Sequence, residues 1–125
     1  MNIFRDVIES IIAKVEGARS VLIVGVDGIV IDRASTEAVD PDKISYELVA
    51  AEYTSLLKTA VRTAEDVEIG LLQELTVFTE QYHFLIKMIT EEYFIMCILS
   101  ADGNFGRARY ELKKAKLILK KEFVV

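Results

Sequence analysis

The sequence predicts an α+β fold in which five strands form one sheet with helices on both faces. Three segments place apolar residues at the three- and four-residue spacing of amphipathic helices. Five shorter runs are rich in the β-branched and aromatic residues that strands favour. In chain order these segments give the pattern α-β-β-α-β-β-β-α. We expect a single domain over residues 1–125, because this length suits one hydrophobic core.

The chain begins with a predicted helix and a predicted hairpin. Residues 2–16 have one apolar face, and Gly17 is expected to end the helix. Residues 21–33, VLIVGVDGIVIDR, predict two strands joined by a two-residue turn at Asp27-Gly28, with Val24 opposite Ile31. The two glycines are not expected to bind phosphate, because a strand rather than a helix follows them.

The longest predicted element is a helix over residues 41–65, with Asp40 as its cap and Pro41 at its first position. Its main apolar arc is wide enough to cover a sheet. Nearly opposite lies a second strip that consists of Ile44, Leu48, Ala51, Ser55, Lys58 and Arg62. A helix on one sheet needs only one apolar side, so the excess predicts contact with a second protein.

Three strands are predicted over residues 71–79, 83–89 and 94–100. The last two are almost continuously apolar, which is typical of central strands covered on both faces. The first alternates between apolar and polar residues and is expected to form an edge of the sheet. Because an open edge invites pairing, we expect a symmetric dimer, strand to strand and long helix to long helix.

The last predicted helix follows Asp102-Gly103, with Asn104 as its cap. Residues 104–125 contain seven of the 15 basic residues in a chain of net charge −5. These cations alternate with an apolar stripe, so we expect a solvated helical face, without nucleic acid or membrane insertion. No apolar run approaches the ~18 residues of a membrane span. We therefore expect a cytoplasmic protein.

The sequence offers little for catalysis. His83 is the only histidine and Cys97 the only cysteine, so a disulfide, a clustered metal site and a serine triad are not expected. We expect His83 to be a strand residue with a satisfied ring nitrogen, and Cys97 to be a buried, inert thiol. No catalytic residue, metal or cofactor is predicted.

Two motifs resemble the Roadblock/dynein light-chain superfamily, and within it the bacterial and archaeal MglB-like regulators. They are the hairpin VLIVGVDGIVIDR and the segment LSADGNFGRARYELKKA at residues 99–115. The resemblance implies strand order 2-1-5-4-3, with the first and last helices on one face and the long helix on the other. One departure is Asp32-Arg33 after the second strand, where relatives usually have small residues.

The resemblance also implies a function. Similar proteins form homodimers through the third strand and second helix, bind a Ras-like small GTPase and influence its nucleotide cycle without being enzymes. Carried onto this chain, the dimer interface would contain Tyr53, Leu56, Leu57, Ala60, Leu72, Glu74, Thr76 and Phe78. The GTPase-binding residues would be Ile44, Leu48, Ala51, Ser55, Lys58 and Arg62.

Other functions remain open on the sequence. A scaffold or adaptor subunit would hold an assembly together without changing nucleotide turnover. A small-molecule sensor is less favoured, because the central strands lack convergent polar groups that would orient a ligand. An enzyme in its own right is less favoured still. Arg62 could be compared with an arginine finger, but an indirect mode of regulation does not require it.

Overall fold

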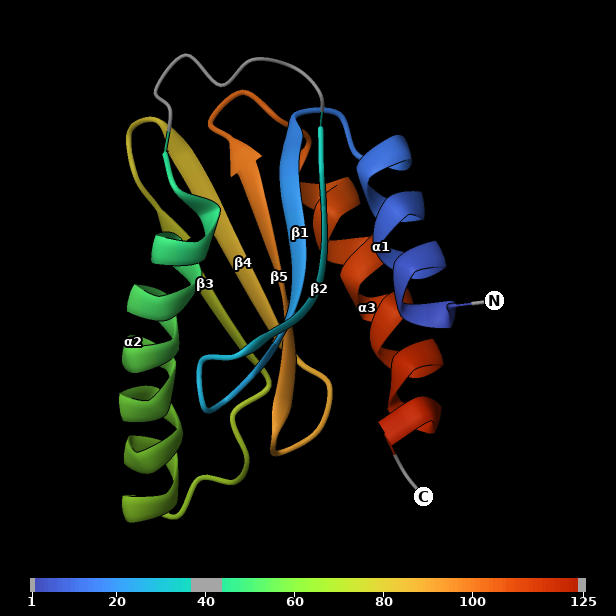
Figure 1. Cartoon of the computed structure of the whole chain (residues 1–125). Helices are drawn as coiled ribbons and strands as arrows, with labels where there is room; N and C mark the ends of the chain where they lie inside the picture. The colour runs from blue at the N-terminus through green and yellow to red at the C-terminus, as the bar shows by residue number, and fades with distance from the viewer. Residues whose placement is uncertain (1, 37–43, 124–125) are drawn as a thin grey trace.

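The fold is a three-layer sandwich with one antiparallel sheet in the middle (Figure 1). The structure is a computed structural model that describes residues 2–36 and 44–123. Its elements in chain order are α1 (Ile3–Lys14), β1 (Ala18–Gly25), β2 (Val30–Ser35), α2 (Tyr46–Asp66), β3 (Glu74–Phe78), β4 (Tyr82–Met88), β5 (Tyr93–Ser100) and α3 (Phe105–Phe123). The strand order β2-β1-β5-β4-β3 confirms the predicted fold class and topology.

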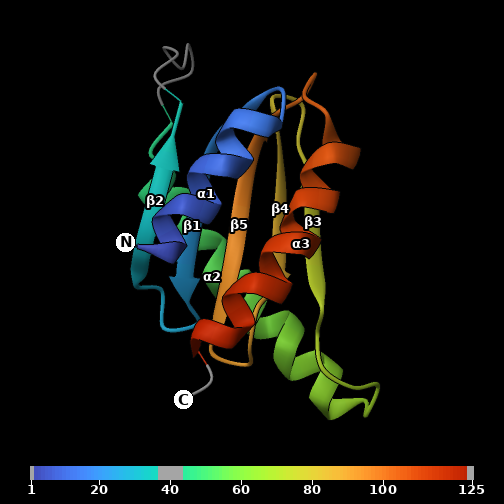
Figure 2. The same ribbon diagram turned by 90° about the vertical axis from the view of Figure 1, so that its right-hand side faces the viewer.

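The sheet divides the hydrophobic core in two. Helices α1 and α3 lie side by side over one face (Figure 2), and α2 alone covers the other. Successive strand residues point to opposite faces, so Ile23 and Cys97 join the α1/α3 core, whereas Leu22 and Met96 join the α2 core. Strands β1, β4 and β5 are therefore buried on both sides, which for β4 and β5 confirms the prediction from their continuous apolar runs.

Asparagine side chains begin the two helices of the α1/α3 layer. Asn2 Oδ1 accepts a hydrogen bond from the Phe4 N–H at 3.0 Å, and Asn104 Oδ1 accepts one from the Arg107 N–H at 3.0 Å. The expected apolar stripe of α3 is confirmed. It packs on the sheet through Phe105, Ala108, Leu112, Ala115 and Leu119. Gly17 has φ +88° just after α1, and a Cβ there would lie 2.5 Å from the Gly103 Cα.

The β1–β2 hairpin differs from the predicted two-residue turn. The Gly25 C=O accepts from the Gly28 N–H, and the Gly25 N–H donates to the Ile29 C=O, both at 2.9 Å. The loop thus has three residues, and only Gly28 needs a positive φ, of +89°. Val24 pairs with Val30, not with Ile31, because a bulge interrupts the ladder there.

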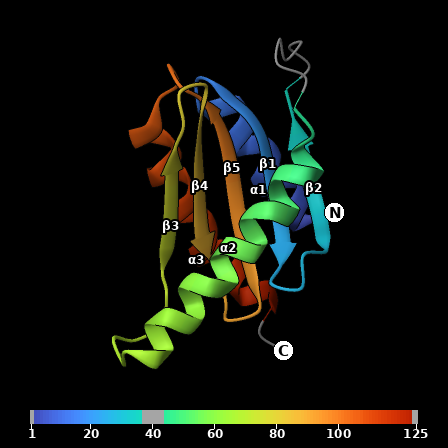
Figure 3. The same cartoon turned by 90° about the vertical axis from the view of Figure 1, so that its left-hand side faces the viewer.

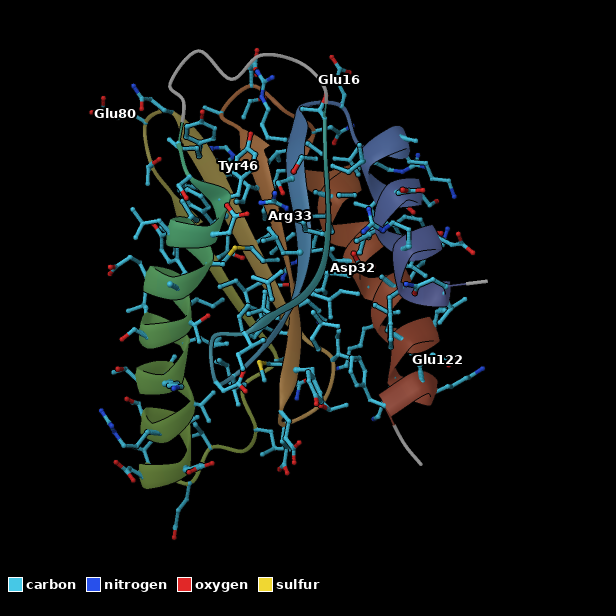
Figure 4. The ribbon with its side chains drawn as sticks, viewed as in Figure 1. Glu16, Asp32, Arg33, Tyr46, Glu80 and Glu122 are labelled. Carbon is cyan, nitrogen blue, oxygen red and sulfur yellow. The ribbon has the colours of Figure 1, made fainter. Side chains whose placement is uncertain are left out.

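Strand β2 is longer than predicted, and so Asp32-Arg33 lies inside it and not after it. The two side chains point to opposite sides of the sheet (Figure 4). Asp32 Oδ1 lies 2.6 Å from the Arg5 guanidinium of α1, while Arg33 pairs with Glu47 of α2. These two ion pairs link the edge strand to the helices on both faces.

Helix α2 begins later than the predicted residue 41. Ser45 is its cap, because the Ser45 Oγ accepts a hydrogen bond from the Leu48 N–H at 3.2 Å. Ile44 therefore precedes the helix, whereas the predicted cap Asp40 and first residue Pro41 lie outside the described residues. Strand β3 is also shorter than the predicted 71–79.

Candidate protein interface

Strand β3 forms an edge of the sheet, as its alternating sequence predicts. The Met88 N–H donates to the Gln73 C=O at 3.0 Å, and the Thr79 N–H donates to the Tyr82 C=O at 2.8 Å. Because residues of an antiparallel strand alternate between bonding the neighbour and facing away, the backbone groups of Glu74, Thr76 and Phe78 point to the free edge. This edge can accept another strand.

Helix α2 crosses the sheet diagonally and presents a flank toward β3 (Figure 3). The Tyr53 ring on this flank lies 4.7 Å from the ring of Phe84 in β4, centroid to centroid. Leu56 is 46% exposed, and Ala60 is half-buried. The flank therefore offers apolar side chains on the side of α2 that faces β3, and the free edge of β3 offers backbone polar groups.

The predicted dimer residues differ in accessibility. Leu57 is completely buried in the α2 core, so it cannot contact a partner, and we exclude it from the candidate interface. Leu72 is half-buried in the same core. Thr76 is exposed on β3, and Phe78 is 58% exposed. Glu74 points to the α3 side, where its carboxylate pairs with Arg109 at 2.9 Å.

The outer side of α2 carries most of the predicted GTPase-binding residues. Leu48, Ala51, Ser55, Lys58 and Arg62 are all exposed and follow one another at three- and four-residue steps. We call these five residues the α2 strip. Ile44 does not belong to it, because Ile44 lies before the Ser45 cap and packs half-buried against the α2 core.

A hollow of about 150 Å³ adjoins one end of the α2 strip. It lies between α2, the β1–β2 loop and the β4–β5 turn, and its lining includes Lys58, Arg62 and Glu65. Val26 and Glu91 complete the opposite wall. Val26 and Glu91 are not among the predicted site residues, because only the folded chain brings their turns next to α2.

A second feature that the sequence analysis missed is the loop after α2. Val67, Ile69 and Leu71 are 57%, 76% and 58% exposed. Glu68 and Gly70 adopt positive φ values of 57° and 97°, which turn the chain between these apolar residues. The segment VEIGL contains this signal, since its apolar residues alternate with a polar residue and a glycine just beyond the helix.

Cys97 and His83, which were considered for possible chemistry, both have surroundings typical of residues with a structural role. Cys97 is fully buried, and this burial raises the pKa of its thiol to about 12. The expectation of a satisfied His83 nitrogen is wrong for Nδ1, which has no hydrogen-bond partner among the described residues. The ring is instead held by stacking on Phe78, with centroids 3.8 Å apart. In residues 2–36 and 44–123, no three potential metal-ligating side chains converge.

Comparison with known proteins gives the class of this architecture. No protein-family model matches the chain. Its fold is that of the Roadblock/LC7 domain of Streptomyces avermitilis, with a TM-score of 0.80 at 13% identity over 95% of this chain and 96% of that one. MglB of Myxococcus xanthus has the same fold, with a TM-score of 0.79 at 15% identity and 98% coverage of both chains.

The relationship extends to the sequence in MglC of Myxococcus xanthus. That structure is 30% identical with a TM-score of 0.70, over 96% of this chain and 98% of MglC. The chain belongs to the Roadblock/LC7 superfamily and is MglB-like in fold. The uncharacterized protein MJ1340 of Methanocaldococcus jannaschii is 28% identical over 110 residues, which cover 88% of this chain and 91% of MJ1340. No helix in the described part of the chain has the length and apolarity to cross a bilayer.

Proposed function

We propose that the protein is a non-enzymatic homodimer that binds a Ras-like small GTPase and modulates its nucleotide cycle. The observation that carries this proposal is the free β3 edge beside the exposed flank of α2. Likeness to MglB and MglC supports it. One solved MglB, similar in fold with a TM-score of 0.81, has a tetrameric arrangement, which supports self-association on this architecture.

In the proposed dimer, the β3 strands of two protomers pair antiparallel. The outward N–H and C=O groups of Glu74, Thr76 and Phe78 would find partners across a twofold axis perpendicular to the sheet. The same axis brings the two α2 helices together on one face. Tyr53, Leu56, Ala60 and Leu72 would then cover the partner's equivalent residues.

The proposed GTPase site is the α2 strip, which the dimer would present twice on one face. Leu48 is 61% exposed and supplies an apolar contact at one end. Lys58 and Arg62 supply positive charge at the other end, beside the hollow that Val26 and Glu91 line. We propose that the bound GTPase hydrolyses its nucleotide with its own catalytic groups, which the dimer positions. The chain would act in the cytoplasm as one domain over residues 1–125.

The test uses a small GTPase encoded beside this chain, loaded with GDP or with a non-hydrolysable GTP analogue. We expect co-elution in one nucleotide state and a changed rate of GTP hydrolysis. Ala51→Arg, which places a long cation in the middle of the α2 strip, should abolish both effects. Ala101→Arg is the matched control, because Ala101 is exposed in the turn before α3 and lies outside α2.

Each outcome has a distinct meaning. A stable complex with unchanged hydrolysis would select the scaffold or adaptor role. Absence of a complex in both nucleotide states would contradict the proposal, as would equal losses in Ala51→Arg and Ala101→Arg. Arg62→Ala should leave stimulation largely intact, whereas a loss of roughly 10³-fold would identify Arg62 as an arginine finger.

A further inference from the structure

The outer face of α3 is strongly basic. The helix contains seven Lys and Arg residues and two Glu residues. Glu111 is buried and pairs with Arg107 at 3.0 Å and with Lys114 at 3.7 Å, and Glu74 of β3 pairs with Arg109. Glu122 is thus the one exposed carboxylate on α3.

Four lysines of this helix pair with no carboxylate among the described residues: Lys113, Lys116, Lys120 and Lys121. The Lys116 ammonium donates instead to the neutral Gln73 side chain, at 3.0 Å from its Oε1. Burial, and then the charges of Lys87 and Lys120, lower the pKa of Lys116. These ammonium groups repel one another, so an anion beside them would be stabilised.

Apolar side chains lie in the middle of the same face. Tyr110 and Leu117 are 56% and 64% exposed. They are one heptad apart, which separates them by only about 20° around the helix axis. By the same helical geometry, Lys113 and Lys120 lie on one side of this ridge, and Lys114 and Lys121 on the other. Ile118, 43% exposed, lies beyond Lys114 toward α1.

The other helices do not share this charge. Helix α1, the neighbour of α3 on the same face of the sheet (Figure 2), has two basic and two acidic residues. Helix α2 has two basic and four acidic residues and lies across the sheet. The charges of α2 are separated from the outer face of α3 by the sheet and by α3 itself. The thickness of α3 alone, about 10 Å, exceeds the Debye length of ~8 Å, beyond which salt at physiological concentration largely screens exposed charges. The acidic groups of α2 therefore weaken the attraction of the α3 face for anions very little.

We propose that the outer face of α3 docks on the surface of a membrane that contains anionic lipids. Lys113, Lys120 and Lys121 would lie among the headgroups, while Tyr110 and Leu117 enter the boundary between headgroups and acyl chains. A basic helical face with an apolar centre is the pattern of peripheral membrane helices. Nucleic acid is a poorer match, because its phosphate backbone offers no contact to an exposed leucine at the centre of the face.

The location of this face is compatible with the proposed function, although docking by a single protomer does not depend on it. The twofold axis of the proposed dimer, perpendicular to the sheet, would place both α3 helices on the face opposite the two α2 strips. Two membrane contacts would then act together, which strengthens docking. The α2 strips would remain free to bind a GTPase at the membrane surface.

The test is co-sedimentation of the full chain with vesicles. We expect binding to equimolar phosphatidylcholine and phosphatidylserine, no binding to phosphatidylcholine alone, and weaker binding as salt concentration rises. The double variant K120Q/K121Q should bind roughly 25-fold more weakly, since each surface cation contributes about fivefold. Leu117→Ser, which leaves the charge unchanged, should bind roughly tenfold more weakly.

The matched control K58Q/R62Q removes the same charge from α2, on the opposite face of the sheet, and should bind vesicles as the unmodified protein does. Thr76→Pro, designed to weaken the dimer, should reduce vesicle binding without abolishing it, so that failure of the dimer and failure of docking are distinguishable. Absence of binding to the mixed vesicles at low salt would overturn the proposal. Equal losses in K58Q/R62Q and K120Q/K121Q would also overturn it, as would binding to duplex DNA or an acidic protein in place of vesicles.

Discussion

The two edges of the sheet, β2 and β3, differ in what they present to another strand. On β2, a bulge between the Ile23 and Val24 pairings breaks the ladder. The Arg33 N–H, which faces outward, donates to the Asp32 carboxylate at 2.9 Å. On β3 the pairing with β4 is regular over the whole strand, and the described residues show no comparable side-chain cap on its outward backbone groups.

The surroundings of the two edges differ in the same sense. Asp32 and Arg33 join β2 to the helices on both faces through charged pairs, and a partner strand would have to approach past these side chains. Around β3 the exposed side chains include the apolar Leu56 of α2 on one face of the sheet and Phe78 of β3 itself on the other. Bulges and charges on an edge strand discourage pairing. The contrast supports the proposal that β3, and not β2, pairs with a partner.

The largest expected effect is a loss of stability, and it distinguishes a core residue of α2 from the adjacent surface residue beside the open edge. Leu57→Ala should lower the free energy of unfolding by about 2–5 kcal/mol, because Leu57 is fully buried in the α2 core. Leu56→Ala, at the adjacent half-exposed position, should cost much less in a monomeric background that carries Thr76→Pro. Urea denaturation of both variants in that background makes the comparison. Similar losses would show that Leu56 belongs to the core and not to an interface.

The second prediction concerns a substitution that disrupts pairing at the open edge strand, β3. Thr76→Pro removes an N–H that faces outward from β3 and spares the bonds to β4. The dimer would lose two symmetry-related hydrogen bonds, about 1–3 kcal/mol together, which raises its dissociation constant roughly 5- to 150-fold. The matched control is Ser35→Pro, whose N–H faces outward on β2. Sedimentation equilibrium should show weaker association only for Thr76→Pro.

The third prediction concerns a substitution that should make the protected edge strand, β2, available for pairing. Asp32→Ala removes the 2.6 Å contact to Arg5 and the cap on the Arg33 N–H, at a cost of about 1–2 kcal/mol in unfolding free energy. Light scattering should then detect particles larger than the dimer as concentration rises. The control Glu9→Ala removes only the exposed 3.9 Å partner of Arg5 and should change stability by less than about 0.5 kcal/mol. Unchanged association of Asp32→Ala would show that this carboxylate does not protect β2.

The smallest effect is expected where α3 contacts the start of β3. Burial, followed by the charges of Lys87 and Lys120, lowers the pKa of Lys116 below the ordinary 10.5. Between these two pKa values the unfolded chain binds more protons than the folded one, so stability should rise with pH in that window. Lys116→Gln should flatten this rise, as measured by urea titrations from neutral pH to pH 10.5. Identical slopes for the two proteins would contradict this assignment.

Sequence patterns were sufficient for the order of helices and strands along the chain, and the family resemblance for the strand order in the sheet, but neither was sufficient for the ends of several elements. The apolar periodicity of α3 and the continuous apolar runs of β4 and β5 reflect burial, and burial determines their places in the fold. The start of α2 was misplaced, because Asp40 and Ser45 are both acceptable caps and local chemistry does not choose between them. The hairpin register was wrong by one residue beyond the bulge, since Asp-Gly fits both two- and three-residue loops.

Part of the candidate site could also be predicted, because helical periodicity shows which residues share one face of α2. Helical geometry, which can be inferred from a sequence, places five residues together on the exposed side of α2: Leu48, Ala51, Ser55, Lys58 and Arg62. Assignment of Leu57 to a dimer surface failed, because a wide apolar arc does not show where the protomer's own core ends. Val26 and Glu91 could not be found from sequence, since tertiary packing alone brings their two turns to α2.

Sedimentation equilibrium at micromolar concentration determines whether β3 and the adjacent flank of α2 bind a second copy of the chain. We expect the protein to have twice the 14.1 kDa mass of one chain, and Thr76→Pro to shift it toward 14.1 kDa while Ser35→Pro does not. A particle of 14.1 kDa for the unmodified protein across this concentration range would show that these surfaces do not form a dimer.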